Sequence, residues 1–233
     1  PKGLYSSSGG TRNGGISHMK FVTEDHNNAL DIVKSNVELG ILWKEICDAL
    51  TSITDERLKN QIPKSANKMS LSAAINDLID QELKAKQWVA QSAIFQGEKY
   101  KDKRWRLDFS KRIETPQKGI TGMAVEVAFN HGEAIAWNLM KPVLAAEINH
   151  VGLETDIGAG VGVYICAKKS LKIAGAFDSA VGEYEKVLRY LVPMAQKLTR
   201  PLIIVGLEAP ESFRLIKVKD PLTKKNSGKI ELI

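Results

Sequence analysis

The chain has 233 residues, and 43% of them are hydrophobic, which is enough for one sizeable core. No stretch reaches the roughly 18 consecutive apolar residues of a membrane-spanning helix, so the composition predicts a soluble protein and excludes an integral membrane protein. The formal net charge of +6 is mildly basic, which permits a polyanionic partner without requiring one.

The first residues differ in composition from the rest of the chain. Residues 1–17 are rich in Gly and Ser and have no hydrophobic run, so they are unlike a secretory signal. We interpret residues 1–18 as an expression leader that is not native, followed by a natural start at Met19 and a single domain over residues 19–233. Lys2 and Arg12 are the only charged residues of this leader, so the remainder of the chain carries a net charge of +4.

Basic residues concentrate in one stretch of the chain. Between residues 98 and 118, eight bases stand against four acids. In most proteins such a stretch is a solvated edge, but it can also hold a phosphate backbone. The bases are Lys99, Lys101, Lys103, Arg104, Arg106, Lys111, Arg112 and Lys118.

The two cysteines lie far apart in the sequence, in apolar surroundings. Cys47 and Cys166 therefore predict buried, reduced thiols in a cytoplasmic protein rather than a disulfide or a zinc site.

The first half of the chain predicts two helices. Hydrophobic residues recur at helical spacing over residues 39–53, typical of one buried helix face. A polar stretch with Pro63 follows and predicts a loop. Ser70 can cap a second helix over residues 71–83, and we expect Trp88 to close that helix against the core.

The middle of the chain changes period. Residues 104–109 alternate between polar and apolar, which predicts a strand with one wet face. Residues 110–119 contain Pro116 and Gly119 and predict a loop. Residues 123–129 are apolar except for Glu126, which indicates a central strand buried on both faces. A helix from about residue 132 to residue 149 is expected next, kinked or divided by Pro142.

The last third predicts strands around one helix. Residues 161–167 form a buried strand, Asp178 can cap a helix that runs to about residue 198, and residues 202–207 form the next strand. Residues 213–218 and 229–233 predict a closing hairpin around a polar turn at 220–228. This order of elements predicts an α/β domain with a mixed β-sheet flanked by helices.

One buried acid suggests chemistry. A carboxylate inside a buried strand is costly unless something neutralises it, and Glu126 lies in such a strand. Asp108 lies on the preceding strand, so the two carboxylates can meet if the strands pair as a hairpin. Two carboxylates with a backbone carbonyl beside them form an all-oxygen site suited to Mg²⁺. A bound metal ion can polarise a phosphate and activate water for phosphodiester hydrolysis.

These residues also resemble a known family. The segments Leu-Asp-Phe-Ser-Lys-Arg at 107–112 and Val-Glu-Val-Ala-Phe at 125–129 are similar to the core of BglII/BstYI-type type II restriction endonucleases, within the PD-(D/E)xK nuclease class. Residues 80–88 resemble the family's Glu-bearing helix that ends in a Trp. The likeness covers most of residues 19–209 and is strong only around residues 107–131.

The resemblance implies a function and a set of site residues. It implies a restriction-endonuclease-like fold that cleaves duplex DNA with Mg²⁺, acting as a homodimer on a GATC-centred palindrome in a prokaryotic cytoplasm. Asp108, Glu126 and the carbonyl of Val127 would be the metal ligands, and Asn130 and His131 would reach base edges. The expected phosphate contacts are Arg104, Arg106, Lys111 and Arg112, with Lys111 and Arg112 near the scissile phosphate.

The chain departs from the family pattern at Ala128. The family carries Gln, Glu or Lys at this third catalytic position, and alanine can neither transfer a proton nor bind a metal. Ala128 is either natural or an engineered inactivation. A catalytically silent DNA-binding relative is therefore the first alternative, and an α/β domain that binds a small ligand or a protein is the second.

Each candidate residue also has a structural interpretation. Asp108 and Glu126 could form a structural pair neutralised by nearby bases. Glu82 is better explained as a solvated helix acid than as a supporting acid of the metal site. Asn130 and His131 could cap the next helix and also contact bases.

Overall fold

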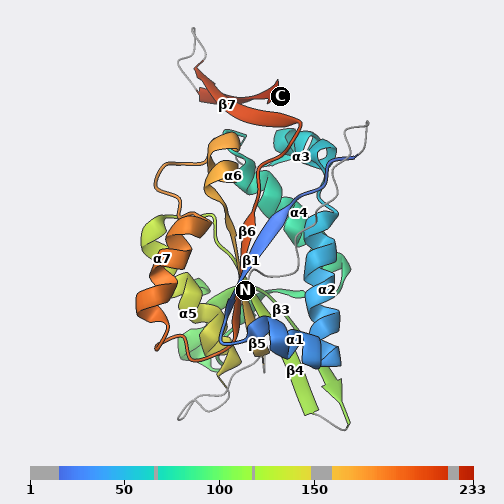
Figure 1. Ribbon diagram of the computed structural model, residues 1–233, viewed down its shortest axis with the longest axis vertical. Coiled ribbons are helices and arrows are strands. Elements are labelled where there is room, and N and C mark those ends of the chain that lie inside the picture. The colour runs from blue at the N-terminus through green and yellow to red at the C-terminus, as the bar shows by residue number, and fades with distance from the viewer. Residues whose placement is uncertain (1–15, 66–67, 117–118, 148–158, 220–225) are drawn as a thin grey trace.

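The computed structural model describes residues 16–65, 68–116, 119–147, 159–219 and 226–233. Its centre is a six-stranded sheet in the order β1-β6-β5-β4-β3-β2 (Figure 1). The three central strands, β4, β5 and β6, run parallel, and the outer strands pair antiparallel to them or to each other. The predicted α/β class and mixed sheet are therefore confirmed. The strands are β1 Phe21–His26, β2 Val89–Ala93, β3 Arg106–Thr115, β4 Gly119–Val127, β5 Ala159–Ala167 and β6 Leu202–Leu207.

Helices cover both faces of the sheet. One face carries α1 Ala29–Ser35, α2 Val37–Thr51 and α4 Leu71–Ala85, with α3 Asp55–Gln61 beside α4. The other face carries α5 Ile135–Ala146 and α7 Tyr184–Met194. Figure 1 shows these two helical layers on opposite sides of the strands. The remaining helical elements are short: η1 Ile62–Lys64, η2 Glu98–Tyr100, η3 Lys103–Trp105, η4 Gly132–Ala134 and α6 Lys169–Ala174.

The alternation of side chains along the central strands divides the core in two. Val163 and Ile165 of β5 belong to the cluster under α2 and α4, whereas Tyr164 and Cys166 belong to the cluster under α5 and α7. This division follows from the period of two in a strand. Every residue of β6 is buried, as expected for a strand covered on both faces.

A glycine allows α5 to lie close to the sheet. A Cβ atom at Gly162 of β5 would approach Leu202 Cδ1 and Pro142 Cβ to 2.9 Å each, which is closer than real Cβ contacts allow. The absence of a side chain at Gly162 thus lets Pro142 of α5 pack directly on β5. Pro142 lies inside α5 without dividing the helix.

A small hairpin ends the described chain. β7 Phe213–Lys219 and β8 Asn226–Leu232 form a separate two-stranded sheet beyond one end of the large sheet (Figure 1). Buried Phe213 and Leu215 join it to the main core. The closing hairpin is confirmed, although residues 226–228 belong to β8 rather than to the turn, and residues 220–225 lie outside the described residues.

Several predicted boundaries were wrong. Residues 110–115 continue β3 instead of forming a loop, because the hairpin extends its hydrogen-bonded ladder as far as Thr115 and Gly119. The stretch predicted as a loop before Pro63 contains α3, which Thr54 caps. Asp178 accepts the amide of Ala180 in a turn, and α7 begins only at Tyr184. The short or weakly patterned elements β1, β2, α1 and α6 were not predicted.

Other predictions hold, prove wrong or stay open. Ser70 caps α4 through the amide of Ser72, Trp88 is buried, and both cysteines are free thiols, although Cys47 is only half-buried. The helix expected over residues 132–149 is shorter than predicted, because α5 begins at Ile135 and ends at Ala146, where Glu147 is already extended. No described helix is long and apolar enough to cross a membrane. The assignment of residues 1–18 as a leader stays a prediction.

Candidate active site

The hairpin of β3 and β4 brings Asp108 and Glu126 together. The ladder between these strands ends at the pair Phe109 and Val125, so the next residue on each strand is Asp108 or Glu126. Past this pair, the side chain of Asp108 continues the contact between the strands, because its Oδ2 atom accepts the amide of Val127 at 2.8 Å. The expectation that the two acids lie on paired strands is confirmed.

Glu126 is one of the most buried acids of the described chain. Its side chain is 3% exposed, and it forms an ion pair with Lys141 of α5 through Oε1. The other oxygen, Oε2, is buried and has no hydrogen-bond partner among the described residues. Burial and the nearby charge of Asp108 raise the pKa of Glu126 to about 8, against the opposing effect of Lys141. The site therefore disfavours a second negative charge unless further positive charge is supplied.

Asp108 is held from two sides. Burial raises the pKa of its carboxyl group, while the amide of Val127, the charge of Lys141 and the side chain of Gln91 lower it. Gln91 of β2 donates to Asp108 Oδ1 at 3.3 Å. Its backbone has a φ of 52°, a strained conformation for a residue with a side chain. Sequence reasoning missed Gln91, because a glutamine in a short strand of mixed burial gives no signal.

These oxygens suit a hard divalent cation. Two carboxylates converge, and one buried oxygen lacks a partner. Val127 directs its amide toward Asp108, and the carbonyl of a strand residue points to the same side as its amide, so this carbonyl faces the same region. No group of three or more His, Cys, Asp or Glu side chains in the described chain could hold a metal. The set therefore fits Mg²⁺ only with backbone or water oxygens completing it.

Ala128 directly follows β4, on the same face as Glu126, but its side chain offers no polar atom. It is 3% exposed and packs in the hydrophobic cluster under α5 and α7, while its amide donates to the carbonyl of Ile165. The third catalytic position of the resembled family is thus part of the core here.

The segment after β4 is exposed and tied to a neighbouring loop. Asn130 Oδ1 accepts from Asn138 of α5 at 2.9 Å, and His131 precedes η4 without a side-chain capping bond. The proposed capping role of these two side chains is therefore wrong. The backbone of residues 130–132 bonds to residues 180–182, through the amides of Gly182 and Gly132.

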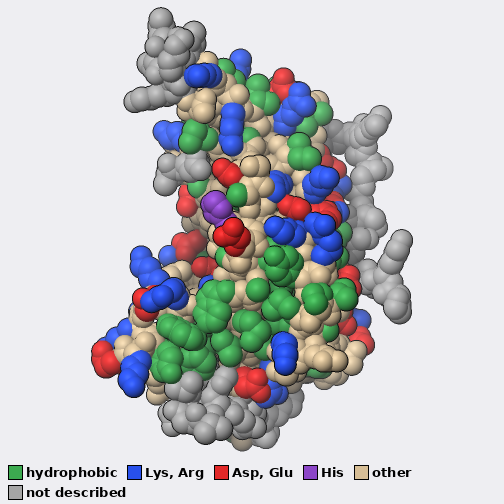
Figure 2. Space-filling view, turned by 90° about the vertical axis from the view of Figure 1, so that its left-hand side faces the viewer, with side chains coloured by type: hydrophobic (Ala, Val, Ile, Leu, Met, Phe, Trp, Pro, Cys, Tyr) green, Lys and Arg blue, Asp and Glu red, His purple; other side chains and the backbone are tan. Residues whose placement is uncertain are grey.

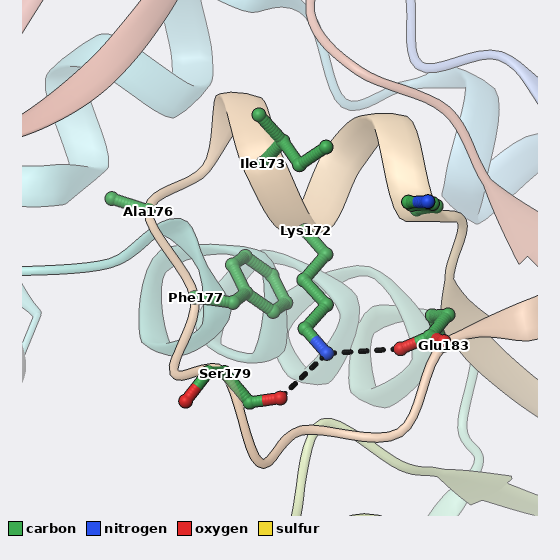
Figure 3. A pocket seen from close by; sticks show the side chains of 7 residues that line it. Lys172, Ile173, Ala176, Phe177, Ser179 and Glu183 are labelled. Atoms are coloured by element: carbon green, nitrogen blue, oxygen red, sulfur yellow. Dashed lines mark hydrogen bonds and ion pairs between the residues drawn. The ribbon is translucent and has the colours of Figure 1, made fainter.

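That neighbouring loop is fixed by Lys172 of α6. Its amine donates to the carbonyls of Ser179 and Val181 and to Glu183, and Figure 3 shows it pointing away from Ile173 toward Ser179 and Glu183. Lys172, Ser179 and Glu183 line a cavity of about 360 Å³. Neither Asp108 nor Glu126 lines this cavity, so we treat Lys172 as a support for the loop rather than as part of the carboxylate site.

The four bases expected to contact phosphates differ in what they bind and in how exposed they are. The amine of Lys111 bonds to both oxygens of Glu45 and to the carbonyl of Lys86, on the sheet face opposite Glu126, so the structure places it away from the carboxylates. Arg106 donates to the carbonyls of Lys101 and Gln91. The remaining two, Arg104 and Arg112, are exposed, and Arg104 pairs with Asp102.

Glu82 takes part in a different contact. It forms an ion pair with Arg57 of α3 at 2.7 Å, so the partner of Glu82 is a base of a neighbouring helix and not the Asp108 site.

On the opposite side of the molecule, the surface over α5 and α7 gathers hydrophobic side chains in its lower half and charged side chains above them (Figure 2). Trp137 and Val192 are exposed on these two helices.

Comparisons with known proteins agree with this architecture. A family model described as restriction endonuclease BglII/BglIII matches residues 21–207. A crystal structure of restriction endonuclease BglII complexed with a DNA 16-mer shares 19% identity, covers 92% of this chain and 100% of its own, and has a TM-score of 0.58. A structure of free BglII has the same identity and 92% and 93% coverage, with a TM-score of 0.48. No curated protein matches the chain.

The six-stranded mixed sheet flanked by helices has the fold of the DNA-bound BglII structure. The family match extends over most of the chain, which shows membership directly. The chain belongs to the BglII/BglIII restriction endonuclease family, whose members are type II restriction endonucleases.

Proposed function

We propose that this endonuclease hydrolyses phosphodiester bonds at a specific site in duplex DNA with Mg²⁺ held by Asp108, Glu126 and the carbonyl of Val127. The observation that carries the proposal is the meeting of the half-buried carboxylate of Asp108 with the buried carboxylate of Glu126, which has one unpartnered oxygen. A divalent cation would neutralise their charge, polarise the scissile phosphate and lower the pKa of a bound water. The family match argues against the small-ligand alternative.

The chain's own residues account for the remaining roles. Val127 and Gln91 hold the carboxylate of Asp108 in place, and burial excludes bulk water from Glu126. Asn130 and His131 are exposed beside the site, and their side chains offer directional hydrogen bonds suited to base edges in the major groove. Arg104 and Arg112 are exposed on the adjoining strand region and suit the phosphate backbone. The family resemblance supports extending the proposal to homodimeric action on a GATC-centred palindrome.

A catalytically silent relative is the second candidate, and Ala128 is the observation that favours it. The deciding experiment incubates unmethylated plasmid and Mg²⁺ with this chain, with Ala128→Glu and with Asp108→Asn. Discrete fragments from the unaltered chain, absent with Asp108→Asn or EDTA, are the expected result, and sequencing the fragment ends gives the site. Cutting by Ala128→Glu alone would support the silent relative. If neither the unaltered chain nor Ala128→Glu cuts the plasmid, the proposed activity is wrong.

A further inference from the structure

The third catalytic position of this chain lacks a functional group, yet the site contains a polar side chain from elsewhere. Ala124 and Glu126 of β4 and Ala128, which directly follows the strand, lie on one face, as alternate residues do, and this is the face that α5 covers. Any group that replaces the missing side chain has to come from a neighbouring element on this face.

Lys141 of α5 is such a group. Its side chain is 10% exposed, and its amine forms an ion pair with Glu126 Oε1 and donates to the carbonyl of Arg106 at 3.2 Å. Arg106 precedes Asp108 on β3 by two residues, so the amine contacts both strands that carry the acids. Pro142, the next residue of α5, packs on Gly162 of β5 and thereby fixes the helix at this height on the sheet.

Stability alone does not account for this lysine. An ion pair this deeply buried contributes little compared with apolar side chains of similar volume, because both charges lose their hydration. Among the ion pairs of the described residues it is the most buried. It also leaves Glu126 Oε2 without a partner, which a purely structural pair would be expected to satisfy.

We propose that Lys141 is a positioning residue for cleavage, which supplies from α5 the polar group that Ala128 lacks. Its amine fixes the rotamer of Glu126 by pairing with Oε1, so that Oε2 stays available to bind the metal ion. This inference rests on the proposed function, since it assigns a role within the same site. It requires that the unaltered chain cuts DNA although position 128 is alanine.

The test moves the amine from one element to the other. Lys141→Met removes the charge and keeps most of the apolar stem, and the double variant Lys141→Met with Ala128→Lys returns an amine at the family position. Lys168→Met is the matched control, because Lys168 forms a partly buried ion pair with Glu208 outside the site. For each protein, cleavage of unmethylated plasmid gives kcat and KM, calorimetric titration of DNA-free protein gives Mn²⁺ affinity, and urea unfolding gives stability.

We expect Lys141→Met to lower kcat by about 100-fold, as for the loss of one positioned catalytic group, with KM for DNA within about threefold because the buried amine does not face phosphates. We expect Mn²⁺ to bind at least as tightly, since a nearby positive charge is removed. The double variant should have a kcat at least about tenfold higher than that of Lys141→Met. Lys168→Met should cut like the unaltered chain.

Other outcomes overturn the inference in distinguishable ways. A Lys141→Met protein that cuts normally, or whose only change is a higher KM, shows that Lys141 does not position the site. If Lys141→Met loses both Mn²⁺ affinity and stability to urea, Lys141 has a structural role. An unaltered chain that is inactive while Ala128→Glu cuts shows that Lys141 does not replace the missing group and leaves the proposed chemistry intact. Inactivity of every protein, Ala128→Glu included, rejects the proposed function as well.

Discussion

Two lysine–glutamate pairs flank the hairpin of β3 and β4 on opposite faces, and they differ in how fully they are satisfied. Lys111 and Glu45 are 19% and 24% exposed, and every oxygen of Glu45 has a partner, with Trp88 donating as well. Lys141 and Glu126 are far more buried, yet Glu126 keeps one oxygen unpartnered. A buried polar atom without a hydrogen-bond partner destabilises the fold. The pair of Lys141 and Glu126 therefore has the properties of a functional site, and the pair of Lys111 and Glu45 has those of a structural ion pair.

The largest expected difference between the two pairs concerns cleavage. Glu126→Gln should reduce cleavage by about a thousandfold or more, because it removes charge that stabilises the reacting centre. Glu45→Ala should change kcat by less than about threefold and lower the free energy of unfolding by about 1–2 kcal/mol, through the unpaired Lys111 and Trp88. Plasmid cleavage and urea unfolding measure both effects. Equal losses of activity in Glu126→Gln and Glu45→Ala would remove the distinction between the structural ion pair and the functional site.

The pH dependence of stability should sharpen the same comparison. Glu126 has a pKa raised to about 8 in the folded protein, above its ordinary value in the unfolded chain, so the folded state binds the proton more tightly. The metal-free protein should therefore lose stability as the pH rises from about 4.5 through about 8. Asp108→Asn should make this loss shallower, because the charge of Asp108 contributes to the raised pKa. Urea unfolding in EDTA across this range measures the slope, and an unchanged slope would contradict the assigned cause.

The residues around the two acids could be predicted from the sequence only in part. Asp108 and Glu126 could be found because strand periodicity and a hairpin place two acids side by side. Lys141 could not, since a lysine within an apolar helix gives no sign of which strand the helix will cover. Its position depends on the packing of Pro142 against Gly162, a tertiary contact between separate segments. Gln91 was missed for a similar reason, because only the pairing of β2 with β3 brings it opposite Asp108.

A third pair, of intermediate burial, extends the comparison to DNA recognition. Lys172 and Glu183 are 17% and 18% exposed, and Lys172 also fixes the loop that bonds to residues 130–132. Lys172→Met should leave kcat within about threefold and weaken binding to the cleavage site about tenfold, the loss of roughly 1.4 kcal/mol. Fluorescence anisotropy in Ca²⁺, with specific and scrambled duplexes, measures this. Equal weakening on both duplexes would show that the loop does not support base contacts.

A pair on the surface, Arg104 with Asp102, should have the smallest effect. Arg104 and Asp102 are 80% and 47% exposed, and exposed pairs contribute little to stability. Arg104→Ala should therefore leave unfolding unchanged. If Arg104 contacts a phosphate as proposed, the variant should bind all duplexes slightly more weakly and reduce the slope of log affinity against log salt by about 1. A salt titration with specific and scrambled duplexes measures both slopes. A change confined to the specific duplex would instead place Arg104 at a base, and an unchanged slope would remove it from the DNA-binding surface.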